Sequence, residues 1–289
     1  MRILLLGSNG QLGTDLQAAA AKRDERIALR LFHRDDLDVT RLEAIAPALG
    51  RHDFDVLINC TSYHKTDEVE GNATQAFAVN AHAVAELAKV CSQKHALFVH
   101  ISSDYVFDGS VRRPYVETDS PRPINVYGAS KAMGECLALA VCERILILRV
   151  ASLFGVAGAS GKGGNFVETM IRVGREKGQL RVVDDVTMSP TATSDAAEII
   201  VQLLLASAPA GIYHVVNSGS ATWCEFARAI VEGARVRATV TPITSAEFPT
   251  RALRPVYSVL NNAKTAGFIG VVPDWTDALH RYLRSKGHI

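Results

Sequence analysis

Tyr127 and Lys131 stand four residues apart at the start of a stretch, residues 131–140, that has a helical pattern. This spacing places both side chains on one helix face. An ammonium group beside a phenol favours the phenolate and lowers the pKa of the tyrosine toward the working pH, so the tyrosine can pass a proton efficiently. The spacing alone also occurs in solvated pairs on surface helices, so it needs support from elsewhere in the chain.

Ser103 gives that support, because it follows an apolar run at residues 96–101 that is typical of a buried strand. Open α/β sheets bind their ligands at the carboxyl ends of such strands. A hydroxyl there would hold a carbonyl oxygen, Tyr127 would protonate that oxygen, and Lys131 would also anchor the ribose of a nicotinamide cofactor. The three residues together predict reduction of a carbonyl group by a hydride from such a cofactor.

Three evenly spaced glycines, Gly7, Gly10 and Gly13, lie between an apolar run at residues 3–6 and a helical pattern at residues 11–21. Glycine permits turn angles closed to other residues and lets the backbone approach a pyrophosphate, while the helix N-terminus offers unpaired N–H groups to the anion. The alternative is an ordinary glycine-rich turn. The position between a strand and a helix favours a dinucleotide site.

The end of the second apolar run, residues 27–32, bears on which dinucleotide binds. Arg34 follows it and favours the 2′-phosphate of NADPH. Asp35 and Asp36 are close enough to keep NADH open as an alternative, and Arg34 could instead be a solvated loop residue. We expect NADP(H) as the cofactor, with NAD(H) as the second choice.

The elements that must position these residues predict an α/β fold. Continuous apolar runs that suit buried strands occur at residues 3–6, 27–32, 54–60, 96–101 and 145–150, with helical patterns between them, the clearest at residues 73–94. Strands separated by helices form parallel β-α-β units in a doubly wound, Rossmann-type sheet.

After residue 150 the chain leaves this pattern. The later elements are a glycine-rich loop at 155–165, helices at 166–176, 194–206, 222–233 and 274–285, and strands at 180–183 and 212–216. We therefore expect a dinucleotide-binding Rossmann domain from residues 1–150 and about 182–217. A smaller α+β substrate lobe would comprise about 151–181 and 218–289.

The composition excludes several classes of protein. Lys plus Arg (31) nearly cancel Asp plus Glu (30), and no dense basic stretch occurs, so we expect no nucleic-acid partner. The five cysteines are an odd number without a Cys-x-x-Cys pair, and the apolar start is too short for a signal peptide or membrane span. We expect a cytoplasmic protein with free thiols and no membrane association. The nine histidines show no metal-binding spacing.

Longer motifs identify a family. They include the three-glycine turn with Gln11-Leu12, the runs LDVT at 37–40 and SSDYVFDG at 102–109, YVETD at 115–119, PINVYG at 123–128, GNF at 164–166 and RP at 254–255. Over nearly the whole chain these resemble the dTDP-4-dehydrorhamnose reductase family, within the short-chain dehydrogenases that have extended C-terminal lobes. The resemblance implies reduction of the 4-keto group of a dTDP-deoxysugar, a sugar nucleotide as substrate, and a possible homodimer.

The resemblance also assigns residues by type of site. The implied cofactor site comprises Gly7, Asn9, Gly10, Gln11, Leu12, Arg34, Asp38, Cys60, Thr61, Tyr63, Asn80, Ser102, Tyr127 and Lys131. Within it, Asp38 would lie near the adenine ring and Asn80 would support the catalytic set, although a structural role inside a helix is an equal alternative for Asn80. The implied substrate site comprises Ser103, Asp104, Tyr105, Ser152, Asn165 and Arg254, the last as a fork for phosphate, with a surface arginine as its alternative.

The chain departs from the family pattern at a few positions. Ser152 stands where the family has a tryptophan that lines the sugar pocket, which predicts a wider or differently shaped pocket. Ser103 replaces a threonine and keeps its hydroxyl. Some members bind magnesium through glutamates, but the corresponding positions here are Asp15 and Ser194, so we expect no metal.

Two other functions remain open. A different nucleotide-linked 4-keto sugar is the nearest alternative, because of Ser152. The fold is also similar to a non-catalytic, dinucleotide-binding regulatory subunit of methionine adenosyltransferase, and the presence of Ser103, Tyr127 and Lys131 does not exclude that role.

Overall fold

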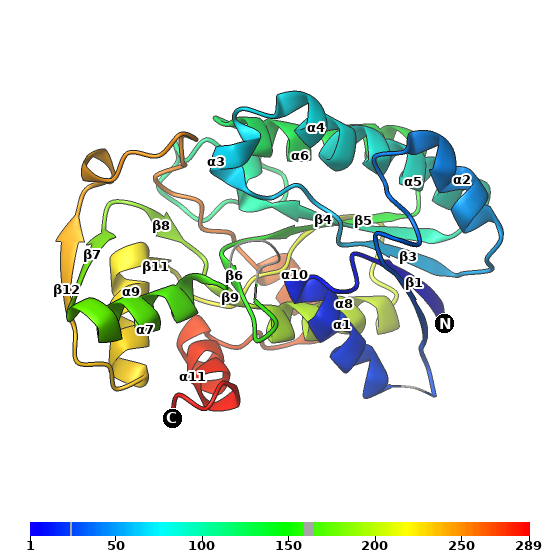
Figure 1. Ribbon diagram of the computed structural model, residues 1–289. Coiled ribbons are helices and arrows are strands. Elements are labelled where there is room, and N and C mark those ends of the chain that lie inside the picture. Colours follow the sequence, from blue (N-terminus) through cyan, green and yellow to red (C-terminus); the bar gives the residue numbers. More distant parts are fainter. Residues whose placement is uncertain (24, 159–163) are drawn as a thin grey trace.

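The centre of the protein is a six-stranded parallel sheet (Figure 1) in a computed structural model that describes residues 1–23, 25–158 and 164–289. From one edge to the other the strands are β10 (Gly211–His214), β5 (Ile145–Val150), β4 (Leu97–Ser103), β3 (Val56–Asn59), β1 (Arg2–Leu6) and β2 (Ala28–Phe32). β2 pairs with one edge of β1 and β3 pairs with the other. The direction in which the chain adds strands to the sheet therefore reverses between β1 and β3. Open sheets bind ligands at such a switch point. The expected doubly wound α/β fold is confirmed.

Both faces of the sheet are covered by helices, which explains the continuous apolar strands. In β1, Ile3 and Leu5 pack in the core on one face while Leu4 and Leu6 pack in the core on the other. The first face carries α1 (Gln11–Ala21), α8 (Thr193–Leu205) and α10 (Ala263–Ile269), and the second carries α2 (Leu42–Gly50), α5 (Ala83–Gln93) and α6 (Val126–Val141), as Figure 1 shows.

The helix expected over residues 73–94 is interrupted. It consists of α4 (Ala73–Phe77), a π-helical turn at Ala78–His82, and α5. The π-helical turn contains Asn80, which is completely buried and hydrogen-bonded through its side chain. Such turns inside helices often mark functional sites.

A smaller lobe lies beside the sheet and has its own core. Its helices are α7 (Phe166–Lys177), α9 (Trp223–Gly233) and α11 (Trp275–Ser285), and its short strands pair as β7 (Gln179–Val183) with β12 (Thr239–Ile243) and β8 (Thr187–Met188) with β11 (Ala221–Thr222). A third strand pair, β6 (Leu153–Phe154) with β9 (Thr191–Ala192), joins the lobe to the sheet domain. Of the expected glycine-rich loop, residues 159–163 lie outside the described residues.

The division of the chain into two domains remains a proposal. Leu180, Val182 and Met188 share the lobe core with Phe226, whereas α8 and β10 pack with the central sheet. This packing favours a boundary near residue 190 in place of the expected 182.

Candidate active site

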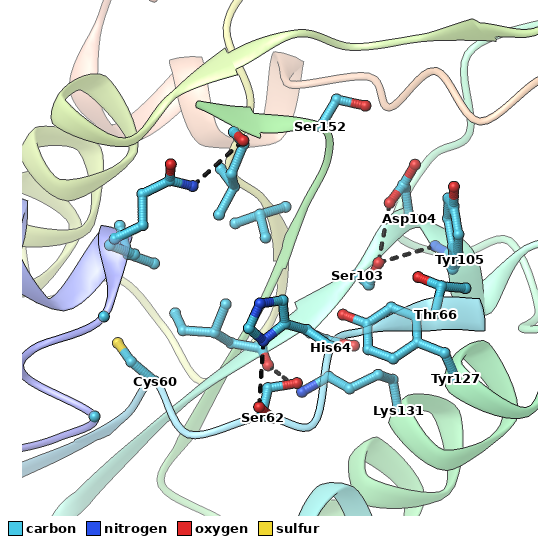
Figure 2. A pocket seen from close by; sticks show the side chains of 18 of the residues that line it. Cys60, Ser62, His64, Thr66, Ser103, Asp104, Tyr105, Tyr127, Lys131 and Ser152 are labelled. Atoms are coloured by element: carbon cyan, nitrogen blue, oxygen red, sulfur yellow. Dashed lines mark hydrogen bonds between the residues drawn. The ribbon is translucent and has the colours of Figure 1, made fainter. Parts of the chain in front are cut away.

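Ser103, Tyr127 and Lys131 line one cavity at the carboxyl ends of the central strands, as Figure 2 shows. Ser103 is the last residue of β4, and the other two lie in the first two turns of α6. Gly128 allows α6 to approach this closely, because a Cβ there would lie 2.0 Å from the carbonyl oxygen of Tyr105. The structure therefore brings together the three residues that the sequence selected.

Tyr127 is held in its protonated form. Burial raises its pKa to about 12, against the opposing effect of hydrogen bonds with the hydroxyls of Ser103 and Ser62. The lowering expected from the neighbouring Lys131 is therefore wrong for this arrangement, because burial has the larger effect. A protonated phenol is the form that a proton donor needs.

Lys131 is buried behind the cavity. Its ammonium donates to the carbonyl oxygen of Ile101 at 2.5 Å and lies 3.3 Å from Nε2 of His100. Burial lowers the pKa of Lys131 to about 8, while the carboxylate of Glu135 raises it. The lysine can thus change its protonation state near neutral pH.

Asp104 and Tyr105 extend the polar wall beside Ser103. The Ser103 hydroxyl donates to Oδ1 of Asp104 at 3.0 Å and accepts from the Tyr105 N–H at 3.2 Å. Burial raises the pKa of Asp104 to about 6, opposed by hydrogen bonds from Ser258 and Ser103. These contacts fix the Ser103 oxygen at the edge of the cavity.

The glycine turn occupies the other end of the cavity, at the switch point. Gly7 adopts a φ of +73°, and a Cβ on it would lie 2.9 Å from the carbonyl carbon of Cys60. A Cβ on Gly13 would lie 2.3 Å from the carbonyl oxygen of Gly7. Both positions therefore require glycine.

The residues around this turn fit a dinucleotide pyrophosphate. No side chain caps α1 at Gly10 and no acidic residue lies in its first turn, so its N–H groups remain available to an anion. The buried Oε1 of Gln11 has no partner among the described residues, although Nε2 donates to Leu153. Gly7, Gly10, Gln11, Leu12, Cys60, Thr61 and Ser102 all line the cavity, whereas Asn9 is exposed beside it.

The residues expected at the adenosine end lie beyond the cavity. The side chain of Arg34 is 78% exposed and lies 3.5 Å from Asp38. Asp38 itself accepts hydrogen bonds from the backbone and side chain of Thr40, which lower its pKa. Arg34 is thus free to turn toward a 2′-phosphate at little cost, and its role remains a prediction.

Asn80 and Tyr63 support the cavity from outside it. The amide of Asn80 bonds both the backbone N–H and the backbone oxygen of Tyr63 and accepts from Ser62, and its Nδ2 also donates to Ser130 of α6. The Tyr63 hydroxyl donates to Glu68. Asn80 therefore holds the loop after β3 against the catalytic helix.

The expected role of Asn165 in the substrate site remains a prediction. Its side chain caps α7 by accepting from the N–H of Glu168 and donates to the oxygens of Gly155 and Tyr282. It does not line the catalytic cavity, because these protein contacts use its amide. Arg254 does not line that cavity either and forms a bidentate ion pair with Asp67 at 2.7 and 3.1 Å.

Beyond the glycine turn, seven cavity residues were not assigned from the sequence: the polar or aromatic Ser62, His64, Thr66 and Trp223, and the apolar Ile101, Val150 and Leu153. The first three follow β3, and a rule that strand ends at the switch point line the site would have found them. Trp223 begins α9 in the lobe, and its approach to the cavity depends on how the lobe packs against the sheet domain, which the sequence does not show.

A buried ion pair lies beneath the site. Glu135 of α6 accepts from Nη2 and Nε of Arg149 in β5 at 2.7 and 3.0 Å, and also from the hydroxyl of Ser102. It ties the catalytic helix to the strand that precedes Ser152.

Two further properties concern the described residues as a whole. In residues 1–23, 25–158 and 164–289, no helix is long and apolar enough to cross a membrane. Within the same ranges no group of three His, Cys, Asp or Glu side chains could hold a metal ion, and Asp15 accepts from the Thr193 hydroxyl.

Comparison with known proteins identifies the family. A family model described as the RmlD substrate binding domain matches residues 1–287. The dTDP-4-dehydrorhamnose reductase of Mycobacterium tuberculosis is 37% identical over 287 residues, covering 96% of this chain and 91% of that protein. A probable dTDP-4,6-dihydroxy-2-methyloxan-3-one 4-ketoreductase of Streptomyces antibioticus is 38% identical, covering 96% and 93%.

A solved structure agrees with these matches. The dTDP-4-dehydrorhamnose reductase of Bacillus anthracis, in complex with NADP, superposes with a TM-score of 0.91 at 34% identity, covering 98% of this chain and 99% of that one. The fold, the cavity and the matches over nearly the full length agree with the family that the motifs predicted. The chain belongs to the dTDP-4-dehydrorhamnose reductase family of NADP(H)-dependent oxidoreductases.

Proposed function

We propose that the protein reduces the 4-keto group of dTDP-4-dehydro-L-rhamnose to give dTDP-L-rhamnose, with NADPH as reductant and Tyr127 as proton donor. The observation that carries this proposal is that Ser103, Tyr127 and Lys131 share one cavity with the glycine turn. The substrate follows from the relatives named above, and the proton donor from the chemistry of the side chains.

The side chains divide the reaction between them. The bound dinucleotide supplies a hydride to the carbonyl carbon. Ser103 holds the carbonyl oxygen by a hydrogen bond, and Tyr127, protonated because its pKa is about 12, donates its proton to that oxygen as negative charge develops. Lys131, one turn along α6, is charged below its pKa of about 8 and offsets the charge of the tyrosinate that remains.

The test is NADPH oxidation by the purified protein with freshly prepared dTDP-4-dehydro-L-rhamnose. Tyr127→Phe should lower kcat by about two orders of magnitude, as loss of a general acid does, and leave NADPH affinity unchanged. Tyr257→Phe is the matched control, because Tyr257 does not line the cavity. Equal kcat values for the two variants would remove Tyr127 from the proton step.

A reductase of a different 4-keto sugar is the second candidate. Ser152 favours it, because a small side chain lines the cavity where the family has tryptophan. The ketoreductase of Streptomyces antibioticus shows that a close relative is named for another dTDP-linked ketone. Comparing kcat/KM for several dTDP-4-keto sugars separates the two candidates.

The purified protein used for the NADPH oxidation assay also tests the alternative role as a regulatory subunit of methionine adenosyltransferase. Tight NADPH binding without turnover of any keto sugar, together with co-purification of a methionine adenosyltransferase, would favour it over both reductase proposals.

We also propose that the protein forms a homodimer. What supports this is the outer face of α6, where Met133 and Leu139 are exposed, while the charged residues of the helix, Lys131 and Glu135, are buried. Light scattering of the eluted protein tests it, and Met133→Glu should shift a dimer toward monomer.

A cytoplasmic location is likewise a proposal. All five cysteines are free thiols, which a reducing compartment maintains. Fractionation of cells that express a tagged chain tests it.

A further inference from the structure

Trp223 is the one residue beyond Leu153, among the described residues, that lines the catalytic cavity. Every other lining residue comes from the sheet domain or from the link that follows β5. Among the described residues of the lobe, Trp223 thus supplies the one side chain that lines the cavity, whereas Ser258 reaches its wall only through a hydrogen bond with Asp104.

The backbone of Trp223 is firmly placed. It is the first residue of α9, and the preceding Thr222 forms a capping box with Glu225. The Trp223 N–H donates to the carbonyl oxygen of Val186 at 3.3 Å. Capping contacts of this kind fix the start of a helix and the direction in which its first side chain leaves.

The indole ring rests on an aromatic base inside the lobe. Its centroid lies 4.7 Å from that of Phe166 at an interplanar angle of 59°, and Phe166 stacks on Phe226 at 5.6 Å and 15°. The side chain remains partly exposed, and its Nε1–H has no hydrogen-bond partner among the described residues. One side of the ring is supported by protein while the cavity side is available to a ligand.

The part of the ligand that lies there follows from connectivity. A 4-keto carbon is a ring atom of the sugar, so the ring must lie where Ser103 and Tyr127 can hold its oxygen. The thymine base is separated from that ring by the diphosphate and the ribose. Trp223 lines the same cavity as Ser103 and Tyr127, so we take the sugar, and not the base, as the part of the substrate that it contacts.

We propose that Trp223 packs against the C–H face and the methyl group of the deoxysugar and determines which sugar is accepted. Indole presents a large apolar surface at little entropic cost, which suits a 6-deoxysugar better than one with a 6-hydroxyl. With a serine at position 152, Trp223 is the only tryptophan or phenylalanine on the cavity wall formed by the described residues. This inference rests on the proposed function.

Binding of product separates the sugar contact from a base contact. Trp223→Ala should weaken binding of dTDP-L-rhamnose by about fivefold to tenfold and leave binding of dTDP unchanged, as loss of one aromatic contact implies. Trp223→Phe should retain most of the affinity for dTDP-L-rhamnose. NADPH affinity and the melting temperature, measured for each variant, show whether the cavity and lobe remain folded.

Fluorescence provides a second readout without turnover, because the protein has only two tryptophans. Trp275→Phe is the matched control, since Trp275 contacts Phe226 edge-on in the lobe and does not line the cavity. Addition of dTDP-L-rhamnose should change the emission of Trp275→Phe, in which Trp223 is the remaining reporter. The emission of Trp223→Phe should stay constant.

The outcomes distinguish the two proposals. If the wild-type protein binds and turns over the rhamnose nucleotides but Trp223→Ala binds product as well as wild type does, this inference alone is overturned. Equal losses for dTDP and dTDP-L-rhamnose would also overturn it, in favour of stacking on the base. If the wild-type protein neither binds dTDP-L-rhamnose nor reduces its keto precursor, the proposed function fails and the inference with it.

Discussion

Removing the carboxylate beneath the active site should destabilise the protein strongly. The side chains of Glu135 and Arg149 are only 2% and 1% exposed, and they meet through two hydrogen bonds. In Glu135→Leu the Arg149 guanidinium would stay buried without its counter-charge, and its Nη1 already lacks a partner. Ser102 would also lose the acceptor of its hydroxyl.

The expected loss is large because one charge of a buried pair is left behind. Breaking such a pair from one side costs about 3 to 5 kcal/mol in free energy of unfolding. For a chain of this size that corresponds to a fall in Tm of roughly 10 °C. The free energy of unfolding is measured by urea denaturation at neutral pH and followed by circular dichroism.

An exposed ion pair provides the matched control. Arg172 and Glu176 lie one turn apart on α7 with side chains 63% and 53% exposed, so Glu176→Leu should cost less than about 1 kcal/mol. The double variant Glu135→Leu/Arg149→Met should recover much of the loss, because it leaves no buried charge. Equal stabilities of Glu135→Leu and Glu176→Leu would refute the reasoning.

Three further predictions concern the cofactor site and the catalytic lysine. Arg34→Ala should raise the Kd for NADPH more than that for NADH, and equal changes would remove Arg34 from the 2′-phosphate. Gly13→Ala should abolish NADPH binding and lower Tm, since its Cβ would lie 2.3 Å from a backbone oxygen, whereas Gly50→Ala, with nothing within 4 Å, should do neither. Because burial lowers the pKa of Lys131 from 10.5 to about 8, the unfolded chain binds more protons than the folded chain between those pH values. The stability of wild type relative to Lys131→Met should therefore rise from pH 8 to 10.5, and a constant difference in unfolding free energy would contradict the burial of a charged lysine.

The sheet could be predicted because each strand carries its own signal. Residues 3–6 of β1 and 56–58 of β3 are apolar on both faces, a pattern typical of a strand that is covered on both sides. The helix α2 falls within the helical patterns expected between the strands but could not be given bounds, because it is short and contains Pro47. Proline usually breaks a helix, but the packing of Ile45 and Leu49 in the core stabilises this one.

The residues of the candidate site also fall into those that the sequence could place and those that it could not. Gly7, Ser103 and Tyr127 could be placed because they follow or face strand ends, where topology alone brings side chains together. Asn165 was assigned by its family motif, although Glu168 three residues later is also the signal of a helix cap. The cap gives Asn165 a structural role, and its contact with substrate stays a prediction.

The pKa of Tyr127 shows why residue spacing does not determine electrostatics. A neighbouring ammonium lowers the pKa of a phenol, but burial of the same phenol raises it, and the sequence gives no measure of burial. Here burial has the larger effect and keeps Tyr127 in its protonated form.

The residues proposed for the proton transfer and the residue proposed to contact the sugar belong to different cores of the protein. Ser103, Tyr127 and Lys131 lie on β4 and α6, which pack in the core of the sheet domain, whereas Trp223 is positioned by the separate core of the lobe. A change in the packing around Trp223 can therefore alter this wall of the cavity, while β4 and α6 keep their own core contacts. If Trp223 contacts the sugar as proposed, substitutions where α9 packs against α7 should change the choice among dTDP-linked ketones more than they change Ser103 or Tyr127.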